Sequence, residues 1–600
     1  MTRHVLALAL ATTAMSVACP ARADTARDRM PQIYTMTPTG VNLQSGTFVH
    51  SETDFTIGAL SFVRAWRSVP SVQLGTASGL DHHRFAAWNH NFGFGARWHP
   101  TRTNGAEIYA DGKVYQFVRQ QDLSWMPWNI DQHNNNAFGA QLTGAIDSNL
   151  VFRNQNGDVY TFDSSNRATR VDYADGTRID LVHDSSGRLD TILSSRGDAI
   201  VLDYNANGLI AAACGFNRAL VFVDVNRTCS QAGNLPQVKV SYGYTSTTAA
   251  QGWNLTGVTG ADGQVTQMTY DTHFRPNLSC IMPPGLGTCR ITNVYGPVGQ
   301  NVDYLPDQVR QQTTATGEVY NYEYLNMTEY AEWPPIEYGE IRLTFSTMTG
   351  PLSERVHAEY ENGFLKRLTT NQGFTQYSWA GLRPTHFTSP GGNVELLDYD
   401  LRGNLWSRTR RAVAGSGDAD IASSATFPIS VPGSYPTGCD ATSQRLCSKP
   451  ITTTDERGNV TDYTYDPAHG GALTVTRPAA PVRQANGTIV NVRPQTRYNY
   501  QQLYAGVRNS AGQIVNAVSP VWVLTQESEC RTTSSCAGTA DEVRTVYEYG
   551  PSGSANALRL RGRTVTDNVT SVRTCFTYDA AGNRISETGP GGAPPTCPAQ

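Results

Sequence analysis

Histidine and aspartate side chains between positions 81 and 99 are the densest set of metal-binding residue types in the chain. The segment DHH, Asp81 to His83, is followed by His90 and His99. Metal ligands on a helix typically lie four residues apart and those on a strand two apart, and this set shows neither spacing cleanly. The pattern favours a loop of surface histidines over a metal site, and we expect no cofactor.

Cysteine spacing predicts disulfides rather than a zinc site. The chain has 11 cysteines, and an even number remains if Cys19 is removed with a leader segment. These fall into neighbouring pairs: Cys214 and Cys229, Cys280 and Cys289, Cys439 and Cys447, Cys530 and Cys536, and Cys575 and Cys597. No two cysteines lie two to four residues apart, as zinc ligands commonly do. We expect local bridges formed in an oxidising compartment.

Known catalytic motifs are missing from the sequence. It contains no G-x-S-x-G, H-E-x-x-H or P-loop pattern and no EF-hand loop. Carboxylates are numerous in the repeats described below, but each has a role in a turn. We therefore expect no enzyme activity and no catalytic or cofactor-binding residue. A secreted hydrolase on a β scaffold is the least favoured alternative.

The N-terminus has the features of a secretory signal. Basic Arg3 precedes an apolar stretch that runs from Val5 to Ala18, and the small-residue triplet Ala21-Arg22-Ala23 follows. This stretch is too short to span a bilayer, so we expect cleavage between Ala23 and Asp24 and a secreted, periplasmic or outer-surface protein. Lipidation of Cys19 is the alternative. No later run is apolar enough for a transmembrane helix.

Composition indicates β structure. The 600 residues include 54 Gly, 31 Pro and 28 Tyr, with 39% hydrophobic and 16% charged residues. Such a chain can bury a core, and the low charged fraction argues against long surface helices. The net charge is -4 and no dense Lys/Arg run is present, so we expect no nucleic-acid partner.

A short aromatic-Asp-Gly unit recurs along the chain. In FTYDAAGN the aromatic and acid are Tyr578 and Asp579, and Gly582 follows. Earlier copies contain Tyr465, Asp466 and Gly470; Tyr399, Asp400 and Gly403; and Tyr270 with Asp271. Upstream, Phe162-Asp163, His183-Asp184 with Gly187, and Tyr204-Asn205 with Gly208 follow one another at a step of 21 residues. A second set, Tyr360, Trp379 and Tyr399, has steps of 19 and 20 residues.

Each unit predicts a β-hairpin. Alternating residues form a strand with one buried face, and the aromatic ends it. The Asp or Asn side chain then bonds the backbone two residues on, and the glycine supplies the positive φ that the turn requires. One hairpin cannot bury its face alone, so neighbours must stack into a continuous sheet, with equivalent aromatics on one face.

The unit resembles the YD repeats of RHS proteins, most closely in GNVTDYTYDPAHG (458–470) and SVRTCFTYDAAGNRISETG (571–589). The segment from Pro38 to Ser68 similarly resembles the β module that precedes YD repeats in secreted bacterial members. The resemblance implies an all-β fold, in which an array of antiparallel hairpins forms a large curled sheet or a partial spiral shell. In complete members the shell encloses a C-terminal toxin released at a core segment, and this sequence shows no DPxGL-like core segment.

The expected organisation is a signal at 1–23, a β module at 33–138, a repeat block at 150–411, a Gly/Ser/Pro-rich linker at 412–448 and a second repeat block at 449–597. Two functions fit it. The first is a secreted or cell-surface scaffold that binds carbohydrate or a neighbouring cell surface. The second is the shell portion of an RHS-type toxin delivery protein, with enclosed cargo from a longer product.

Overall fold

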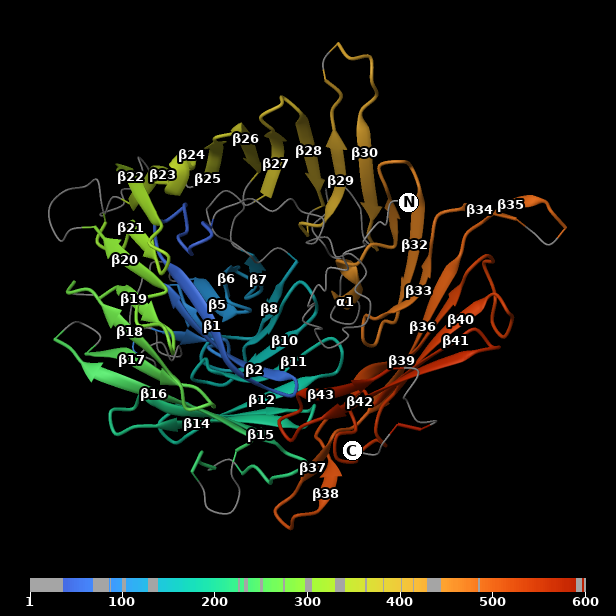
Figure 1. Cartoon of the computed structure of the whole chain (residues 1–600), viewed down its shortest axis with the longest axis horizontal. Helices are drawn as coiled ribbons and strands as arrows, with labels where there is room; N and C mark the ends of the chain where they lie inside the picture. The colour runs from blue at the N-terminus through green and yellow to red at the C-terminus, as the bar shows by residue number, and fades with distance from the viewer. Residues whose placement is uncertain are drawn as a thin grey trace, which may run out of the picture.

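One continuous antiparallel sheet makes up the wall of the molecule. The computed structural model describes residues 36–67, 86, 88–99, 104–127, 139–224, 227–230, 236–248, 252–273, 276–296, 305–329, 340–361, 364–380, 383–400, 402–413, 415–428, 444–483, 486–589 and 596–597. Within these residues the wall has 32 strands, β8 to β33, β36 and β39 to β43, and it curls into a ring (Figure 1). The predicted all-β repeat array is confirmed.

The first half of the wall runs from β8 to β24. Its strands are β8 (Gln141–Thr143), β9 (Val151–Arg153), β10 (Val159–Phe162), β11 (Ala168–Asp172), β12 (Arg178–His183), β13 (Leu189–Ser194), β14 (Asp198–Tyr204), β15 (Ile210–Asn217), β16 (Val238–Ser246), β17 (Trp253–Thr259), β18 (Val265–Tyr270), β19 (Leu278–Met282), β20 (Ile291–Tyr295), β21 (Val309–Thr314), β22 (Val319–Glu329), β23 (Glu340–Thr349) and β24 (Arg355–Glu361). A short 3-10 turn, Pro351–Ser353, joins the last two.

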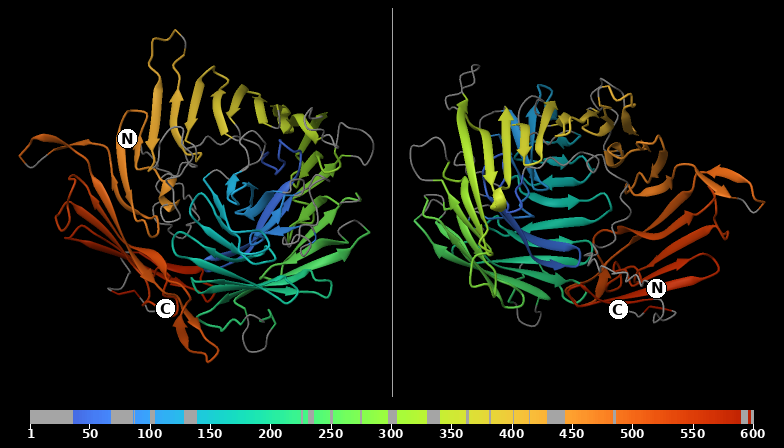
Figure 2. Two further views of the ribbon diagram at one scale, coloured as in Figure 1. Left: turned by 180° about the vertical axis from the view of Figure 1, so that it is seen from behind. Right: turned by 45° about the horizontal axis from the view of Figure 1, so that its top comes forward.

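The second half completes the ring. Its strands are β25 (Phe364–Thr370), β26 (Gly373–Ala380), β27 (Arg383–Thr388), β28 (Val394–Tyr399), β29 (Leu405–Arg410), β30 (Ile421–Thr426), β31 (Thr452–Thr454), β32 (Val460–Tyr465), β33 (Ala472–Thr476), β36 (Gln495–Leu503), β39 (Val521–Cys530), β40 (Glu542–Glu548), β41 (Gly562–Thr566), β42 (Ser571–Tyr578) and β43 (Arg584–Thr588). Two hairpins project from this half (Figure 2): β34 (Ala480–Arg483) with β35 (Ile489–Val492), and β37 (Gly506–Arg508) with β38 (Ile514–Asn516).

Two small sheets lie inside the wall and form the N-terminal module. One contains β1 (Val49–Ile57), β2 (Leu60–Arg67) and β3 (Asn89–His90); the other contains β4 (Gly95–Trp98), β5 (Gly105–Ala110), β6 (Lys113–Arg119) and β7 (Trp125–Pro127). Module residues such as Phe62 and Ile108 share one hydrophobic cluster with wall residues from Leu142 to Leu368. The main core is therefore the layer between the module and the inner face of the wall.

A β-bulge recurs next to the repeat aromatic. Tyr204 pairs with Ile210 whereas the preceding Asp203 pairs with Ala212, so the returning strand carries one extra residue. The same register shift precedes Phe162, His183, Tyr270, Tyr295, Tyr360, Trp379, Tyr399, Tyr465, Tyr500 and Tyr578. Because bulges bend a strand and increase its twist, their repetition gives the sheet a regular curl.

The predicted positions of the repeat aromatics are confirmed. Phe162, His183 and Tyr204 end β10, β12 and β14, and one returning strand separates each pair of these strands in the sheet. Tyr399 likewise ends β28, and Tyr360 and Trp379 are the last residues but one of β24 and β26. Each follows a bulge, so the copies are equivalent in register.

The expected linker needs a correction. Its range, 412–448, contains wall strand β30 and the short helix α1 (Gln444–Cys447). The sequence of β30, IASSAT, has no apolar alternation, but its backbone pairs with β29 on one side and β31 on the other. Its backbone hydrogen bonds to two neighbouring strands make it a strand, and its side-chain pattern does not predict one. The wall also begins at β8, ahead of the expected boundary at 150.

Candidate functional site: the inner face of the wall

The predicted aspartate side chains accept hydrogen bonds from backbone N–H groups of their own turns. Asp184 Oδ1 accepts hydrogen bonds from the N–H groups of Ser186 and Arg188, both at 2.9 Å, and Asp579 Oδ1 accepts one from Asn583 at 2.8 Å. Equivalent bonds involve Asp163, Asn205, Asp271, Asp400 and Asp466. Gly187, Gly208, Gly403, Gly470 and Gly582 have φ between 68° and 86°. These carboxylates are committed to turns and form no cluster for acid–base chemistry.

In many units the terminal aromatic donates a hydrogen bond to the preceding hairpin. Tyr204 Oη donates a hydrogen bond to the carbonyl of Leu189 at 2.6 Å. The same bond joins Tyr270 to Leu255, Tyr295 to Leu278, Tyr324 to Val309, Trp379 to Leu365, Tyr399 to Pro384, Tyr465 to Pro450 and Tyr578 to Leu560. The bond needs a donor on the ring, so Phe162 ends its strand without it, and the buried hydroxyl of Tyr500 has no hydrogen-bond partner among the described residues.

A second inner tyrosine, two residues before the terminal aromatic, contacts the module. Tyr242 Oη donates to Asp54 Oδ2 at 2.7 Å, and Tyr160 donates to Asp111. Tyr322 joins a hydrogen-bonded group with Thr39 of the module, 3.1 Å away. Sequence analysis missed the role of this position, although the quoted copy GNVTDYTYDPAHG also has a tyrosine, Tyr463, two residues before its terminal aromatic. The inner wall thus binds polypeptide through hydroxyl donors.

The contact around Asp54 is buried and charged. Arg64, 1% exposed, donates to Asp54 at 3.1 Å and to Glu52 at 2.9 Å, and lies 4.6 Å over the ring of Trp88. Burial raises the pKa of Asp54, and the Arg64 guanidinium opposes this shift. A hydrogen bond from His50, with the charge of Arg64, lowers the pKa of Glu52 to about 2. The ion pairs lie within the module and compensate its buried charges, since an unpaired buried charge is strongly destabilising. The wall joins this network through the hydroxyl of Tyr242.

The last repeat closes the ring against β14 and the module. The N–H of Gly58 donates to Ala581 O at 3.0 Å, and Arg559 lies 3.5 Å from Asp198. Asp198, 3% exposed, also accepts a hydrogen bond from the N–H of Ala59 at 3.0 Å. Burial raises the pKa of Asp198 to about 6 despite the nearby positive charges of Arg559, Arg196 and Arg218. Module, wall and last repeat therefore meet at one carboxylate.

Four of the expected disulfides lie in the described residues. They join Cys214 to Cys229, Cys280 to Cys289, Cys530 to Cys536, and Cys575 to Cys597. Cys439, the expected partner of Cys447, lies outside the described residues. The bridges tie loops and the chain end to the strands from which they depart.

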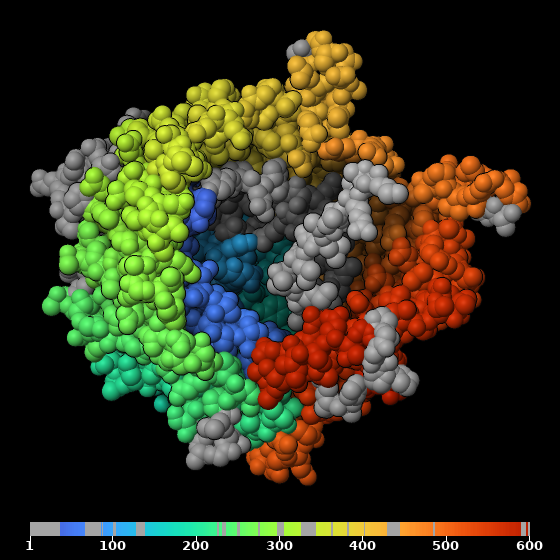
Figure 3. All heavy atoms as spheres, viewed as in Figure 1, coloured from blue at the N-terminus to red at the C-terminus, as the bar shows by residue number. Residues whose placement is uncertain are grey.

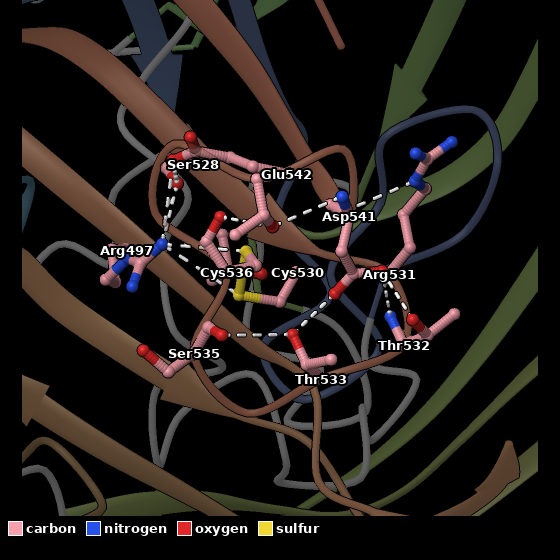
Figure 4. Close-up of a disulfide and its surroundings, with 12 residues drawn as sticks. Arg497, Ser528, Cys530, Arg531, Thr532, Thr533, Ser535, Cys536, Asp541 and Glu542 are labelled. Carbon is pink, nitrogen blue, oxygen red and sulfur yellow. Dashed lines mark hydrogen bonds and ion pairs between the residues drawn. A yellow bond between two sulfur atoms is a disulfide. The ribbon is translucent and has the colours of Figure 1, made fainter. Parts of the chain in front are cut away.

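Cys530, Cys536 and Asp541 lie close enough together to hold a metal ion (Figure 4). They are the one such group of His, Cys, Asp or Glu residues found among the described residues. Its sulfurs are bonded to each other, and Asp541 accepts hydrogen bonds from Thr532 at 2.8 Å and Thr533 at 2.6 Å. Arg497 donates to Ser528 at 3.1 Å beside them. With its ligand atoms engaged in these bonds, the group is a structural loop.

The histidines of the first candidate cluster have separate surroundings. His90 is buried and stacks on Phe62 with ring centroids 5.4 Å apart. His99 lies 3.7 Å from Glu107. Asp81 to His83 fall outside the described residues, as do the expected cleavage residues Ala23 and Asp24. No helix in the described part of the chain is long and apolar enough to cross a membrane.

No family model and no curated protein matches the chain. Solved structures similar to it include TcdB2-TccC3 without its hypervariable C-terminal region, at 11% identity and TM-score 0.28 over 88% of this chain. The TcdB2-TccC3-Cdc42 structure matches 89% at 12% identity and TM-score 0.29, and the Photorhabdus luminescens Tc holotoxin pore 81% at 12% and 0.25. This chain spans 26% to 28% of those chains.

Proposed function

We propose that the protein is an RHS-type shell scaffold whose inner wall holds polypeptide, as part of a delivery device. The observation that carries this proposal is that the inner tyrosines Tyr160, Tyr242 and Tyr322 already bind one polypeptide segment, the N-terminal module. The wall curls around a hollow, visible in the space-filling view (Figure 3). A closed wall with a polypeptide-binding inner face has the properties that a cargo shell requires.

The carbohydrate hypothesis has less support from the geometry. A sugar-binding surface needs aromatic faces open to solvent, whereas the terminal aromatics face inward and are bonded to neighbouring hairpins. Binding to carbohydrate or to a cell surface stays a prediction, as do export and the expected lack of enzyme activity.

A photo-crosslinker on either face of one strand tests the proposal. Benzoylphenylalanine would replace Thr461, which shares the inner face with Tyr463, or Thr464, which is exposed on the opposite face of β32. The probe is reduced, carboxymethylated α-lactalbumin, a polypeptide that cannot refold. The proposal predicts a saturable covalent product from position 461 and little from 464.

Equal labelling from both positions, or none from position 461, would contradict the proposal. Circular dichroism and thermal unfolding of both variants, measured first, show that the wall remains folded, so a lack of product then reports on binding.

A further inference from the structure

We propose that the inner face of β36, β40 and β41, beyond the reach of the described module residues, binds an extended polypeptide. The tyrosines and arginines of this face would bind the carboxylate side chains of that polypeptide. This inference rests on the proposed function and names the chemistry by which the same surface selects its occupant.

The covered half of the wall shows what its tyrosines bind. Tyr160 and Tyr242 donate their hydroxyls to carboxylates of the module, Asp111 and Asp54. A phenol is a good donor to a carboxylate, and charge-assisted hydrogen bonds are stronger than neutral ones. In both contacts an inner tyrosine of the wall binds an acidic side chain of an enclosed segment, Asp54 on strand β1 and Asp111 in the turn between β5 and β6.

The same face continues past the module. Residues directly opposite each other in a ladder share a face of the sheet. Leu368, the last buried wall residue of the shared core, lies opposite Thr375 on β26, so the inner face continues into the second half of the wall. The tyrosines two residues before the terminal aromatic there are Tyr377, Tyr463 and Tyr498. No hydrogen-bond partner for the hydroxyl of Tyr498 is found among the described residues.

Two arginines on this face have a buried Nε with no hydrogen-bond partner among the described residues. Tyr547 lies opposite Arg563 in the ladder, and Arg561 precedes Arg563 on the same face. The Nε atoms of both arginines are buried, and neither has a hydrogen-bond partner in the part of the chain that the structure describes. Buried polar groups are nearly always paired, so these two are the independent sign of an anionic ligand.

Neighbouring pairs show that this face accepts carboxylates. Glu527, opposite Tyr498, accepts a hydrogen bond from Tyr547 at 3.2 Å. Arg477 pairs with Glu529 at 2.5 Å. Where a carboxylate of the chain itself is within reach, the tyrosines and arginines bind it; Arg561 and Arg563 are left for a carboxylate from an enclosed segment.

Fluorescence anisotropy with matched peptides tests this proposal. Two dye-labelled peptides of alternating Thr and Val carry either Glu or Gln at every third position. The Glu peptide is expected to bind about tenfold more tightly at low salt, and added salt should narrow the difference. R561Q/R563Q should bring its affinity close to that of the Gln peptide, and Tyr498→Phe should weaken it about threefold.

Arg573→Gln is the matched control: Arg573 on β42 pairs with Glu548 on β40, on the outer side of the wall, so this variant should leave both affinities unchanged. If the two peptides bind equally well while position 461 still gives its photo-crosslinked product, this inference would be overturned and the proposed function would stand. Binding of neither peptide would contradict both. If inorganic polyphosphate displaces the Glu peptide and binds more tightly than it does, the conclusion that the ligand is a carboxylate of a polypeptide would be overturned.

Discussion

A single hydroxyl group joins successive hairpins of the wall, and Tyr465 is a clear example. Its Oη donates to Pro450 O at 2.8 Å, whereas Tyr463 on the same face has a weaker contact, 3.3 Å from Thr453 Oγ1. Tyr465→Phe should lower the free energy of unfolding by about 1 kcal/mol, because one net hydrogen bond is lost. Tyr463→Phe should cost less. Equal losses in chemical denaturation would show that the clamp has no special role.

Gly582 combines a left-handed turn with a crowded site. Its φ is 86°, and an added Cβ would lie 1.7 Å from Arg559 Nη1. Gly263 has a φ of 78° and no atom within 4 Å of the same position, so it isolates the cost of backbone strain. Gly582→Val should destabilise the protein by about 1–3 kcal/mol, and by more than Gly263→Val. Identical melting temperatures for the two variants would rule out the contact with Arg559.

Asp198 gives the ring closure a pH dependence with a defined sign. Its pKa in the folded protein, about 6, lies above its ordinary value of 3.8, so the folded state binds the proton more tightly. Its contribution to stability is therefore fully present below its ordinary pKa and is lost as pH rises through the folded pKa.

Asp198→Asn removes this titration and tests the sign. Between about pH 5 and pH 7 the wild type should lose roughly 1 kcal/mol relative to the variant. Thermal unfolding of both proteins across this range measures the difference, with Asp262→Asn, an exposed turn residue, as the control. A difference that stays constant with pH would show that Asp198 is ionised normally.

At the scale of the elements, the disulfides attach excursions to the sheet. Cys575 lies on β42 and Cys597 near the chain end, 22 residues on. Replacing both by serine should lower the free energy of unfolding by about 3 kcal/mol, because the loop closure no longer restricts the unfolded chain. Peptide mapping without reductant should recover this bridge from the wild type, and free thiols at both positions would contradict the assignment.

Local patterns predicted the hairpins because the turn chemistry is contained in the unit itself. Asp184 and Asp579 bond backbone groups within four residues, so their role is visible in a short window. Strand β30 was missed because its backbone pairing, rather than its side chains, defines it. The inner role of Tyr242 was missed because its partner, Asp54, lies 188 residues away. Long-range contacts of this kind leave no periodic signal.

For the molecule as a whole, recurrent bulges and inner tyrosines give one result: a curled sheet that binds polypeptide on its concave side. The module against β14 to β16 and the last repeat against Asp198 close the ring. A wall assembled from equivalent hairpins needs an inner layer, because each unit exposes an apolar face when alone.

The most direct test of the account is an electron cryo-microscopy map of the chain. The account predicts a closed ring of antiparallel hairpins around a hollow, with β1 to β7 against the inner face of the first half and continuous density between Tyr242 and Asp54. A map in which the hairpins form an open, extended array, or in which the module lies on the outer face, would contradict it.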